Sequence, residues 1–361
     1  NLINRYGDDI KCFEILNEPN YGLYYDLEDV KKYSDLVNCI SKDIPNIIVG
    51  ATSGLEETNE KYLSSLDFFE MIAPETYEST KIYSYHPYDM ENYNNQNLKL
   101  HRLNQLHKEY FNELGGFIKK YVTEYGVSSN TTVKPTGIDE STQAIKLVEQ
   151  SIIMDKYDID LAIQYLFRNT GVDQTSQSYN YGLVTYDYLP KLSYYAMKNL
   201  LTNTNGAEYI GTVDLADGLE AHVYDKDGKP KMIVWSTNTE QAVELTYTGF
   251  TASDIYGNAI ENTDGTLEIT TSPVYLDNIS NRYFYEAISN TALEKYATFE
   301  EKFATELASI DGIDAKIEEL KQYMSSISEK TTEAQDTAIQ KMSEHFALGN
   351  TILNAYKNGE L

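Results

Sequence analysis

The feature that most constrains the fold is an alternation of short apolar strands with amphipathic helices from residue 1 to about residue 202. The helices are recognised by apolar side chains at three- and four-residue spacing, as in Val30, Tyr33 and Val37. A strand, a helix and a second strand in succession favour a parallel sheet. We therefore predict an α/β fold with five such units in this region.

The boundaries of these elements follow from the apolar patterns and from capping residues. The expected strands cover 10–16, 47–51, 82–85, 117–123 and 161–167. The expected helices cover 28–43, 58–72, about 100–114, 141–156 and 190–201. Asp139 is expected to cap the fourth helix, and Pro190 is expected to lie in the first turn of the fifth.

Two further parts follow the α/β region. Residues 205–287 contain short alternating strands separated by turn sequences such as Asp227-Gly228 and Asp264-Gly265, which predict a small antiparallel β-sandwich. Residues 288–361 lack proline, and Ile313, Ile317 and Leu320 keep a helical spacing. We expect three domains: residues 1–204 α/β, 205–287 sandwich, and 288–361 a helical bundle or hairpin.

Composition excludes several classes of protein. The formal net charge of −27 argues against a nucleic-acid partner, because phosphate binding needs clustered Lys and Arg. No apolar run approaches the ~18 residues of a transmembrane helix. Cys12 and Cys39 form no cluster with metal-ligand spacing, so we expect neither a metal nor a cofactor. The 32 tyrosines suit stacking on sugar rings, but biased nucleotide composition is the preferred explanation for them.

Two carboxylates follow predicted strands at positions where chemistry is expected. Glu18, in Asn17-Glu18-Pro19, ends the first strand, and Glu124, in Thr123-Glu124-Tyr125-Gly126, ends the fourth. Active-site groups of a parallel α/β barrel lie at the carboxyl ends of its strands. Each motif alone also has an ordinary interpretation, as a turn that caps a helix or as a surface glutamate in a loop.

A third motif, Tyr85-His86-Pro87-Tyr88, ends the strand between them. A lone histidine beside an apolar strand is more often structural than catalytic, but Tyr88 could donate a hydrogen bond to a carboxylate and keep it ionised. Two carboxylates on one barrel rim meet the requirement of retaining glycoside hydrolysis, in which they lie about 5–5.5 Å apart.

The order of these three motifs resembles the strand 4, 6 and 7 signatures of clan A glycoside hydrolases. The segment 181–184, with Pro190-Lys191 opening a helix, resembles the passage from strand 8 to helix 8 of that clan. Segments 218–224 and 254–258 are similar to the sandwich of family 39-like members. The resemblance covers residues 8–286 and implies the last five βα units of a TIM (β/α)₈ barrel.

The resemblance also implies roles for individual residues. Glu18 matches the acid/base and Glu124 the nucleophile. Asn17 matches the residue that binds the sugar 2-hydroxyl, Tyr88 the hydrogen-bond partner of the nucleophile, and His86 a residue on the leaving-group side.

The sequence departs from the family pattern in its aromatic residues. Leu16 stands where the family usually has tryptophan, and the only tryptophan, Trp235, falls in the sandwich. The clan usually has an aromatic platform on strand 8. Tyr165 and Phe167 are two residues apart, hence expected on one face of the strand, and either could supply it; Arg168 follows directly.

Together these observations predict a retaining glycoside hydrolase that acts on a polysaccharide or oligosaccharide outside the cell or at its surface. The alternatives are a catalytically silent carbohydrate-binding or surface-interaction protein, and a transglycosylase or phosphorylase on the same scaffold. The helical tail would suit protein or cell-surface contacts.

The acid/base motif, normally on strand 4, occurs at residue 18. We therefore expect an N-terminally truncated barrel with strands 4–8 only, open edges at 10–16 and 161–167, and a tendency of the isolated fragment to aggregate or be inactive.

Overall fold

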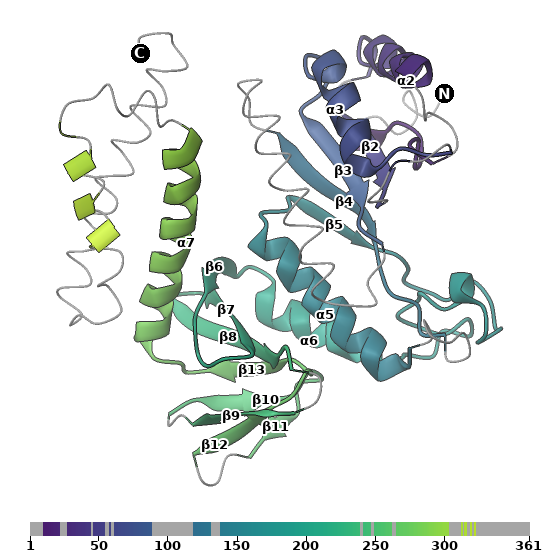
Figure 1. The fold of residues 1–361 in the computed structure, drawn as a ribbon. Helices are drawn as coiled ribbons and strands as arrows, with labels where there is room; N and C mark the ends of the chain where they lie inside the picture. The colour runs from purple at the N-terminus through teal and green to yellow at the C-terminus, as the bar shows by residue number, and fades with distance from the viewer. Residues whose placement is uncertain are drawn as a thin grey trace. The chain divides into compact units, whose positions relative to one another are not determined.

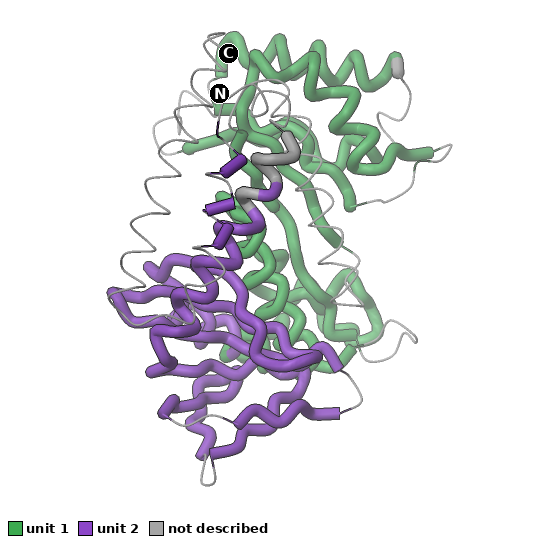
Figure 2. Tube along the Cα trace, turned by 60° about the vertical axis from the view of Figure 1, so that its left-hand side comes forward, with its two compact units in different colours: residues 1–195 green, residues 196–361 purple. Residues whose placement is uncertain are grey.

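The computed structural model divides the chain into two compact units, residues 1–195 and residues 196–361, which are described separately (Figure 2). The described residues are 10–21, 27–44, 46–54, 58, 61–88, 118–130, 138–238, 241–246, 249–261 and 265–302, with a few positions between 312 and 322.

The first unit is built on a parallel sheet of five strands (Figure 1). The strands are β1 (Phe13–Glu14), β2 (Ile47–Ser53), β3 (Ile82–His86), β4 (Lys119–Tyr125) and β5 (Leu161–Gln164). Each strand pairs in parallel with the next one along the chain, in the order β1-β2-β3-β4-β5. A barrel advances around its sheet in this way, whereas a doubly wound fold reverses direction. The prediction of five parallel strands is confirmed, in the form of a curled half-barrel.

The curl of the sheet is evident from one hydrogen bond across it. Thr123 Oγ1 on β4 donates to Glu14 Oε1 on β1 at 2.7 Å. Adjacent strands are about 4.8 Å apart, so a flat sheet would hold β1 and β4 about 14 Å apart, beyond the reach of these side chains. The strands therefore wrap around a common interior into which both side chains point.

Helices pack against the opposite, convex face. Tyr33 of α2 (Leu27–Ile40) donates to the Ile15 carbonyl at 3.1 Å and accepts from the Gly50 amide at 3.1 Å. Ser151 of α5 (Glu140–Lys156) lies 3.0 Å from the Tyr125 hydroxyl on β4. Buried hydroxyl groups thus fasten these helices to the backs of the strands.

The helix boundaries confirm some sequence predictions and correct others. Asp139 caps α5 as predicted, accepting from the Thr142 amide at 2.7 Å. Helix α3 (Ser65–Thr76) was expected from residue 58, but it starts later because Ser64 caps it. Helix α6 (Leu192–Thr204) starts after Pro190, which instead forms a β-bridge with Val184. The helix predicted at 100–114 lies outside the described residues.

The second unit contains two antiparallel sheets. The strands are β6 (Glu208–Thr212), β7 (Leu219–Lys226), β8 (Lys229–Ser236), β9 (Val243–Thr246), β10 (Thr251–Ser253), β11 (Ala259–Ile260), β12 (Thr266–Ile269) and β13 (Val274–Asp277). One sheet has the order β11-β10-β13-β8-β7-β6, and β12 pairs with β9. Their inward apolar side chains, including Val223, Val234 and Ile269, are fully buried in one core. Strands β6, β10 and β11 had not been delimited from the sequence.

Helix α7 (Asn281–Lys302) is joined closely to this core. Ala287 belongs to the core cluster, and Thr291 donates to the Ile210 carbonyl on β6 at 2.8 Å. A Cβ atom at Gly211 would overlap the Thr291 hydroxyl, so glycine permits the close approach of α7 to β6. The expected boundary between residues 287 and 288 lies within this helix. Among the described residues, no helix is long and apolar enough to cross a membrane.

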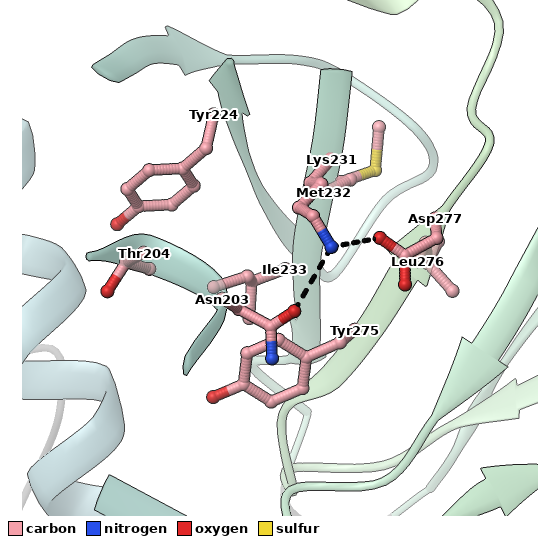
Figure 3. Close-up of a pocket in the computed structure, with 9 residues that line it drawn as sticks. All are labelled: Asn203, Thr204, Tyr224, Lys231, Met232, Ile233, Tyr275, Leu276 and Asp277. Atoms are coloured by element: carbon pink, nitrogen blue, oxygen red, sulfur yellow. Dashed lines mark hydrogen bonds and ion pairs between the residues drawn. The ribbon is translucent and has the colours of Figure 1, made fainter. Parts of the chain in front are cut away.

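A small hollow lies beside β8 and β13 in the second unit (Figure 3). Lys231 forms an ion pair with Asp277 and donates to Asn203 Oδ1 at 3.2 Å. Tyr275 also lines the hollow, and burial raises the pKa of its hydroxyl. These contacts lock β8, β13 and α6 together.

Candidate active site

The carboxylates of Glu18 and Glu124 converge on one histidine. Glu18 Oε1 lies 3.1 Å and Glu124 Oε2 lies 3.9 Å from Nδ1 of His86. The two oxygens are therefore no more than about 7 Å apart, against carboxyl separations of about 5–5.5 Å in retaining and about 6.5–9.5 Å in inverting glycosidases. His86 is the last residue of β3 and Glu124 is the penultimate residue of β4, whereas Glu18 follows β1, which is shorter than the expected strand 10–16. Residues from three strands of one sheet thus form a single site.

His86 occupies the centre of this site. It is the last residue of β3, and its side chain is fully buried. In the described part of the chain, the hydrogen-bond partner of Nδ1 is Glu18, and Nε2 lies 3.1 Å from Thr123 Oγ1. Because both ring nitrogens have partners, the orientation of the imidazole is fixed.

Glu124 has a different hydrogen-bond partner from Glu18. The Tyr88 hydroxyl donates to Glu124 Oε2 at 2.9 Å. Burial, and secondly the neighbouring Glu124 carboxylate, raise the pKa of Tyr88, so the phenol keeps its proton and acts as a donor. A phenol that only donates favours the ionised form of the carboxylate it contacts.

Tyr88 is held in place by two other tyrosines. Its ring meets Tyr165 and Tyr181 edge-on, with centroids 6.4 and 6.0 Å away, and those two rings are 5.6 Å from each other. This three-tyrosine cluster forms a wall beside Glu124. A Cβ at Gly126 would overlap the Tyr165 carbonyl oxygen, so glycine allows the chain after Glu124 to approach this wall.

The backbone around Glu18 is strained. Leu16 has φ of 64° and Glu18 has φ of 46°, a left-handed region that L-residues seldom adopt. The Glu18 amide donates to the Ala51 carbonyl at 3.0 Å, which secures the conformation. Strained backbone of this kind costs about 1–3 kcal/mol per residue and concentrates at functional sites.

The loop that follows Glu18 is anchored by Asn20. This fully buried side chain donates to the carbonyls of Ser53 and Leu63, at 3.1 and 3.0 Å, and accepts from the Ser53 amide at 2.8 Å. The strained turn is therefore held between the end of β2 and the start of α3.

Irregular pairing directs Glu124 into the site. The register between β4 and β5 shifts between Val122 and Tyr125, the stretch that contains Thr123 and Glu124. A second shift separates Val49 from Thr52 on β2. Bulges change the direction in which side chains point and are frequent beside active sites.

The remaining residues predicted for the site differ in whether they contact the other site residues. Asn17 is exposed between the two left-handed residues. Tyr165 lies in the tyrosine cluster, whereas Phe167 is 60% exposed. The expectation that Tyr165 and Phe167 share a strand face is wrong, because β5 ends at Gln164 and two-residue alternation does not continue beyond it.

Arg168 and Trp235, two residues at which the sequence departs from the aromatic pattern of the family, both contact aromatic rings. Arg168 stacks over Tyr186 and Tyr188, with ring centroids 4.3 and 4.4 Å from its guanidinium carbon. Trp235 stacks on His222, with centroids 4.8 Å apart, on the face of the sheet opposite to the core residues Val223 and Val234. Trp235 is therefore a buried residue of the second unit and not part of the candidate site.

Sequence reasoning assigned no role to Glu14, Ser84, Thr123, Asn20 or Tyr181. Ser84 had a recognisable signal, since it is the polar residue in a predicted strand that is otherwise apolar and aromatic, whereas Glu14 and Thr123 lie in predicted strands that also contain lysine. Asn20 and Tyr181 had none, because their roles depend on residues far away in the chain. Within the described residues, no group of three or more His, Cys, Asp or Glu side chains is arranged to hold a metal ion.

Comparison with known proteins defines the class of fold. No family model and no curated protein matches the chain. Among solved structures, a family 39 glycoside hydrolase from the gut symbiont Bacteroides cellulosilyticus WH2 aligns with a TM-score of 0.61 at 18% identity, over 77% of this chain and 60% of that one. A beta-porphyranase of glycoside hydrolase family 86 from the human gut bacterium Bacteroides plebeius aligns with a TM-score of 0.54 at 12% identity, over 75% and 57%.

Both of these structures are clan A glycoside hydrolases. The resemblance to this clan is therefore confirmed at the level of the fold. The chain spans about three fifths of the length of either structure.

Proposed function

We propose that this protein is a retaining glycoside hydrolase in which Glu18 is the acid/base and Glu124 the nucleophile. The observation that carries the proposal is the convergence of both carboxylates on Nδ1 of His86, at 3.1 and 3.9 Å. The clan A fold supports it, because the three residues lie at the strand ends where a parallel barrel carries its chemistry.

The hydrogen-bond partners support the division of roles. Glu124 accepts from Tyr88, whose raised pKa keeps it a donor, and this favours a carboxylate ready to attack. Glu18 pairs with an imidazole nitrogen, which can share a proton with it. One group is therefore suited to nucleophilic attack and the other to proton transfer.

The reaction would proceed in two displacements. In the first, a Glu124 oxygen bonds to the anomeric carbon while the glycosidic C–O bond breaks, and Glu18 gives its proton to the departing oxygen. In the second, Glu18 takes a proton from water, the water oxygen bonds to the anomeric carbon, and the bond to Glu124 breaks. Both residues return to their starting states.

The same proposal extends to substrate contacts and location. Asn17 is exposed beside Glu18, where it would reach the sugar 2-hydroxyl, and Tyr165, in the tyrosine cluster, is better placed than Phe167 to bound the sugar beside Glu124. The substrate would be a polysaccharide or oligosaccharide met outside the cell or at its surface. A catalytically silent carbohydrate-binding role is less favoured, because both carboxylates keep their hydrogen-bond partners.

The test is hydrolysis of a panel of aryl glycosides that differ in the sugar, followed by proton NMR of the first product. Retention predicts that the initially released sugar has the anomeric configuration of the substrate. Release of the opposite anomer would contradict the nucleophile assignment. Failure to cleave any member, by a protein that binds sugars, would favour the silent alternative.

A further inference from the structure

A third carboxyl group, that of the exposed residue Glu14, is joined to the proposed site through hydrogen bonds to neighbouring strands. Glu14 Oε1 on β1 accepts from the Ser84 hydroxyl at 2.6 Å and from the Thr123 hydroxyl at 2.7 Å. Ser84 in turn accepts from the Ala51 amide at 2.9 Å, so its single proton is directed to Glu14. An oxygen that accepts two hydroxyl protons carries none of its own, so Glu14 Oε1 acts only as an acceptor in both hydrogen bonds.

This arrangement fixes the proton of Thr123. A hydroxyl has one proton to donate, and Thr123 directs it to Glu14. Towards His86 Nε2, at 3.1 Å, the Thr123 oxygen can therefore only accept. The proton of that hydrogen bond must be carried by Nε2.

The proton on Nε2 determines how the other ring nitrogen, Nδ1, interacts with Glu18. With the proton of neutral imidazole on Nε2, Nδ1 is a bare acceptor. The 3.1 Å contact between Nδ1 and Glu18 Oε1 then requires a proton on Glu18, or one moved from Glu18 to Nδ1. In both cases the pair holds the proton that a leaving group needs.

We propose that Glu14, acting through the Thr123 hydroxyl, keeps His86 protonated on Nε2 and so reserves Nδ1 for the acid proton of Glu18. Glu14 and Thr123 are positioning residues in this proposal, since neither needs to touch the substrate. The inference rests on the proposed function for its catalytic consequence, but the proton position on His86 can be measured without any substrate.

In the part of the chain that the structure describes, no other titratable group takes the place of Glu18 or Thr123 at the ring nitrogens of His86. Glu124 is 3.9 Å from Nδ1, beyond hydrogen-bond distance, and it accepts from Tyr88. Two residues before Thr123 on β4, Tyr121 interacts with the Cys12 thiol and not with His86. Burial raises the pKa of Tyr121, and the Cys12 thiol raises it further. The polar groups bonded to the ring nitrogens of His86 are therefore Glu18 and Thr123.

The direct test is the tautomer of His86, read from long-range ¹H–¹⁵N NMR of the whole protein. The sequence has five histidines, and the signal missing in His86→Gln assigns the ring. The proposal predicts a proton on Nε2 in the wild type and in Thr123→Ser, which keeps the hydroxyl. Thr123→Val and Glu14→Leu, which remove the hydroxyl and its acceptor, should move a substantial fraction of the proton to Nδ1.

A matched control is Thr76→Val. Thr76 is also buried in this unit, but its hydroxyl contacts Ile72 and Tyr83 rather than the site. Its loss should leave the His86 signals unchanged. A wild-type proton on Nδ1 alone would overturn the proposal, and so would unchanged His86 signals in both Thr123→Val and Glu14→Leu.

The kinetic readout is the pH profile for a glycoside with a poor leaving group. A proton on Nδ1 would point at Glu18 and favour its carboxylate, so Thr123→Val should shift the alkaline limb of kcat/KM to lower pH. At neutral pH we expect a loss of about 10- to 100-fold, against less than about threefold for a dinitrophenyl glycoside that needs no acid. Thr123→Ser should restore the wild-type profile.

The two proposals fail in different ways. If the NMR gives the expected tautomer and its switch, but the wild type cleaves no glycoside, the hydrolase proposal fails and the hydrogen-bond chain stands. If the wild type cleaves glycosides but Thr123→Val changes neither the tautomer nor the pH profile, the chain fails and the hydrolase stands.

Discussion

The half-barrel sheet and the sandwich use the inward-facing positions of their strands for opposite purposes. In the sandwich these positions carry apolar side chains such as Val223, Val234 and Ile269, all fully buried in one core. In the half-barrel they carry Glu14 and Thr123, which bond to each other across the interior. Inward-facing strand positions thus form an apolar core in one unit and part of the candidate active site in the other.

Polar residues at the inward-facing positions of a strand therefore mark a candidate functional site more strongly than apolar residues do. Burying a polar group is unfavourable unless it is hydrogen-bonded, and the buried side chains of Thr123 and His86 in the half-barrel are bonded to each other. Their orientation is therefore fixed by contacts within the protein. The sandwich core is made of apolar side chains instead, and polar side chains pair across its strands outside that core, as in Tyr209 with His222 and Lys231 with Asp277.

The largest effect is expected where the half-barrel loses its nucleophile. Glu124→Gln should reduce kcat for aryl glycosides by about 10⁴-fold or more, because the amide cannot form the covalent intermediate. The free energy of unfolding should change little or rise, since a charge is removed from the interior. Steady-state kinetics and urea unfolding of the variant measure both quantities.

Glu75→Gln is the matched control for that change, because Glu75 is an exposed residue of α3. It should leave kcat at the wild-type value. A Glu124→Gln protein that retains more than a few per cent of wild-type kcat would contradict the assignment of the chemistry to the half-barrel.

Removal of the acid/base should have a smaller and selective effect. Glu18→Ala should lower kcat/KM by about 10²- to 10⁴-fold for glycosides with poor leaving groups, which need a proton. Dinitrophenyl glycosides should lose little in kcat/KM, and added azide should accelerate their turnover by replacing water. Equal losses on both classes of substrate would argue that Glu18 is not the acid.

The sandwich should respond in stability rather than in chemistry. Ile269→Ala removes a fully buried side chain and should lower the free energy of unfolding by about 2–5 kcal/mol. The neighbouring Glu268→Ala, on the exposed face of β12, should change it by less than about 0.5 kcal/mol. Denaturant unfolding measures both, and similar values for the two variants would mean that the sandwich core is not what stabilises this unit.

The smallest effect concerns a buried charge in the half-barrel unit. Burial lowers the pKa of Lys191 to about 8, while its amine donates to the Gly182 carbonyl at 2.8 Å. Between this value and the unfolded value of 10.5 the unfolded chain binds more protons, so stability from Lys191 rises with pH. Relative to Lys191→Met, the wild type should gain about 2 kcal/mol from pH 7 to pH 9.5.

Paired denaturation curves at the two pH values give that difference. No change, or a relative loss of wild-type stability, would show that Lys191 is charged in the folded protein.

Strands and helix starts could be predicted from the sequence wherever neighbouring residues determine them. The five strands of the half-barrel follow from apolar runs, and the start of α5 follows from Asp139. Local patterns misplaced the start of α3, because the capping action of Ser64 outweighed the helical spacing before it. They also extended β5 to Phe167, although pairing ends at Gln164.

The site was predictable only in part, for a physical reason. Glu18, His86 and Glu124 end strands, and strand ends are identifiable from one sequence. The partnership of Glu14 with Thr123 depends on the curl of the sheet, which joins residues 109 positions apart. No local pattern encodes that closeness.

The central claim is that Glu124 forms a covalent bond to the sugar, and mechanism-based labelling tests it most directly. The protein is incubated with 2-deoxy-2-fluoro glycosides that carry a dinitrophenyl leaving group, chosen from the sugars hydrolysed in the aryl glycoside panel. It is then digested and its peptides are sequenced by mass spectrometry. The account predicts one added fluoro-sugar on Glu124, and no label in Glu124→Gln. Label on Glu14 or Glu18, or rapid turnover of the substrate with no label on any carboxylate, would contradict it.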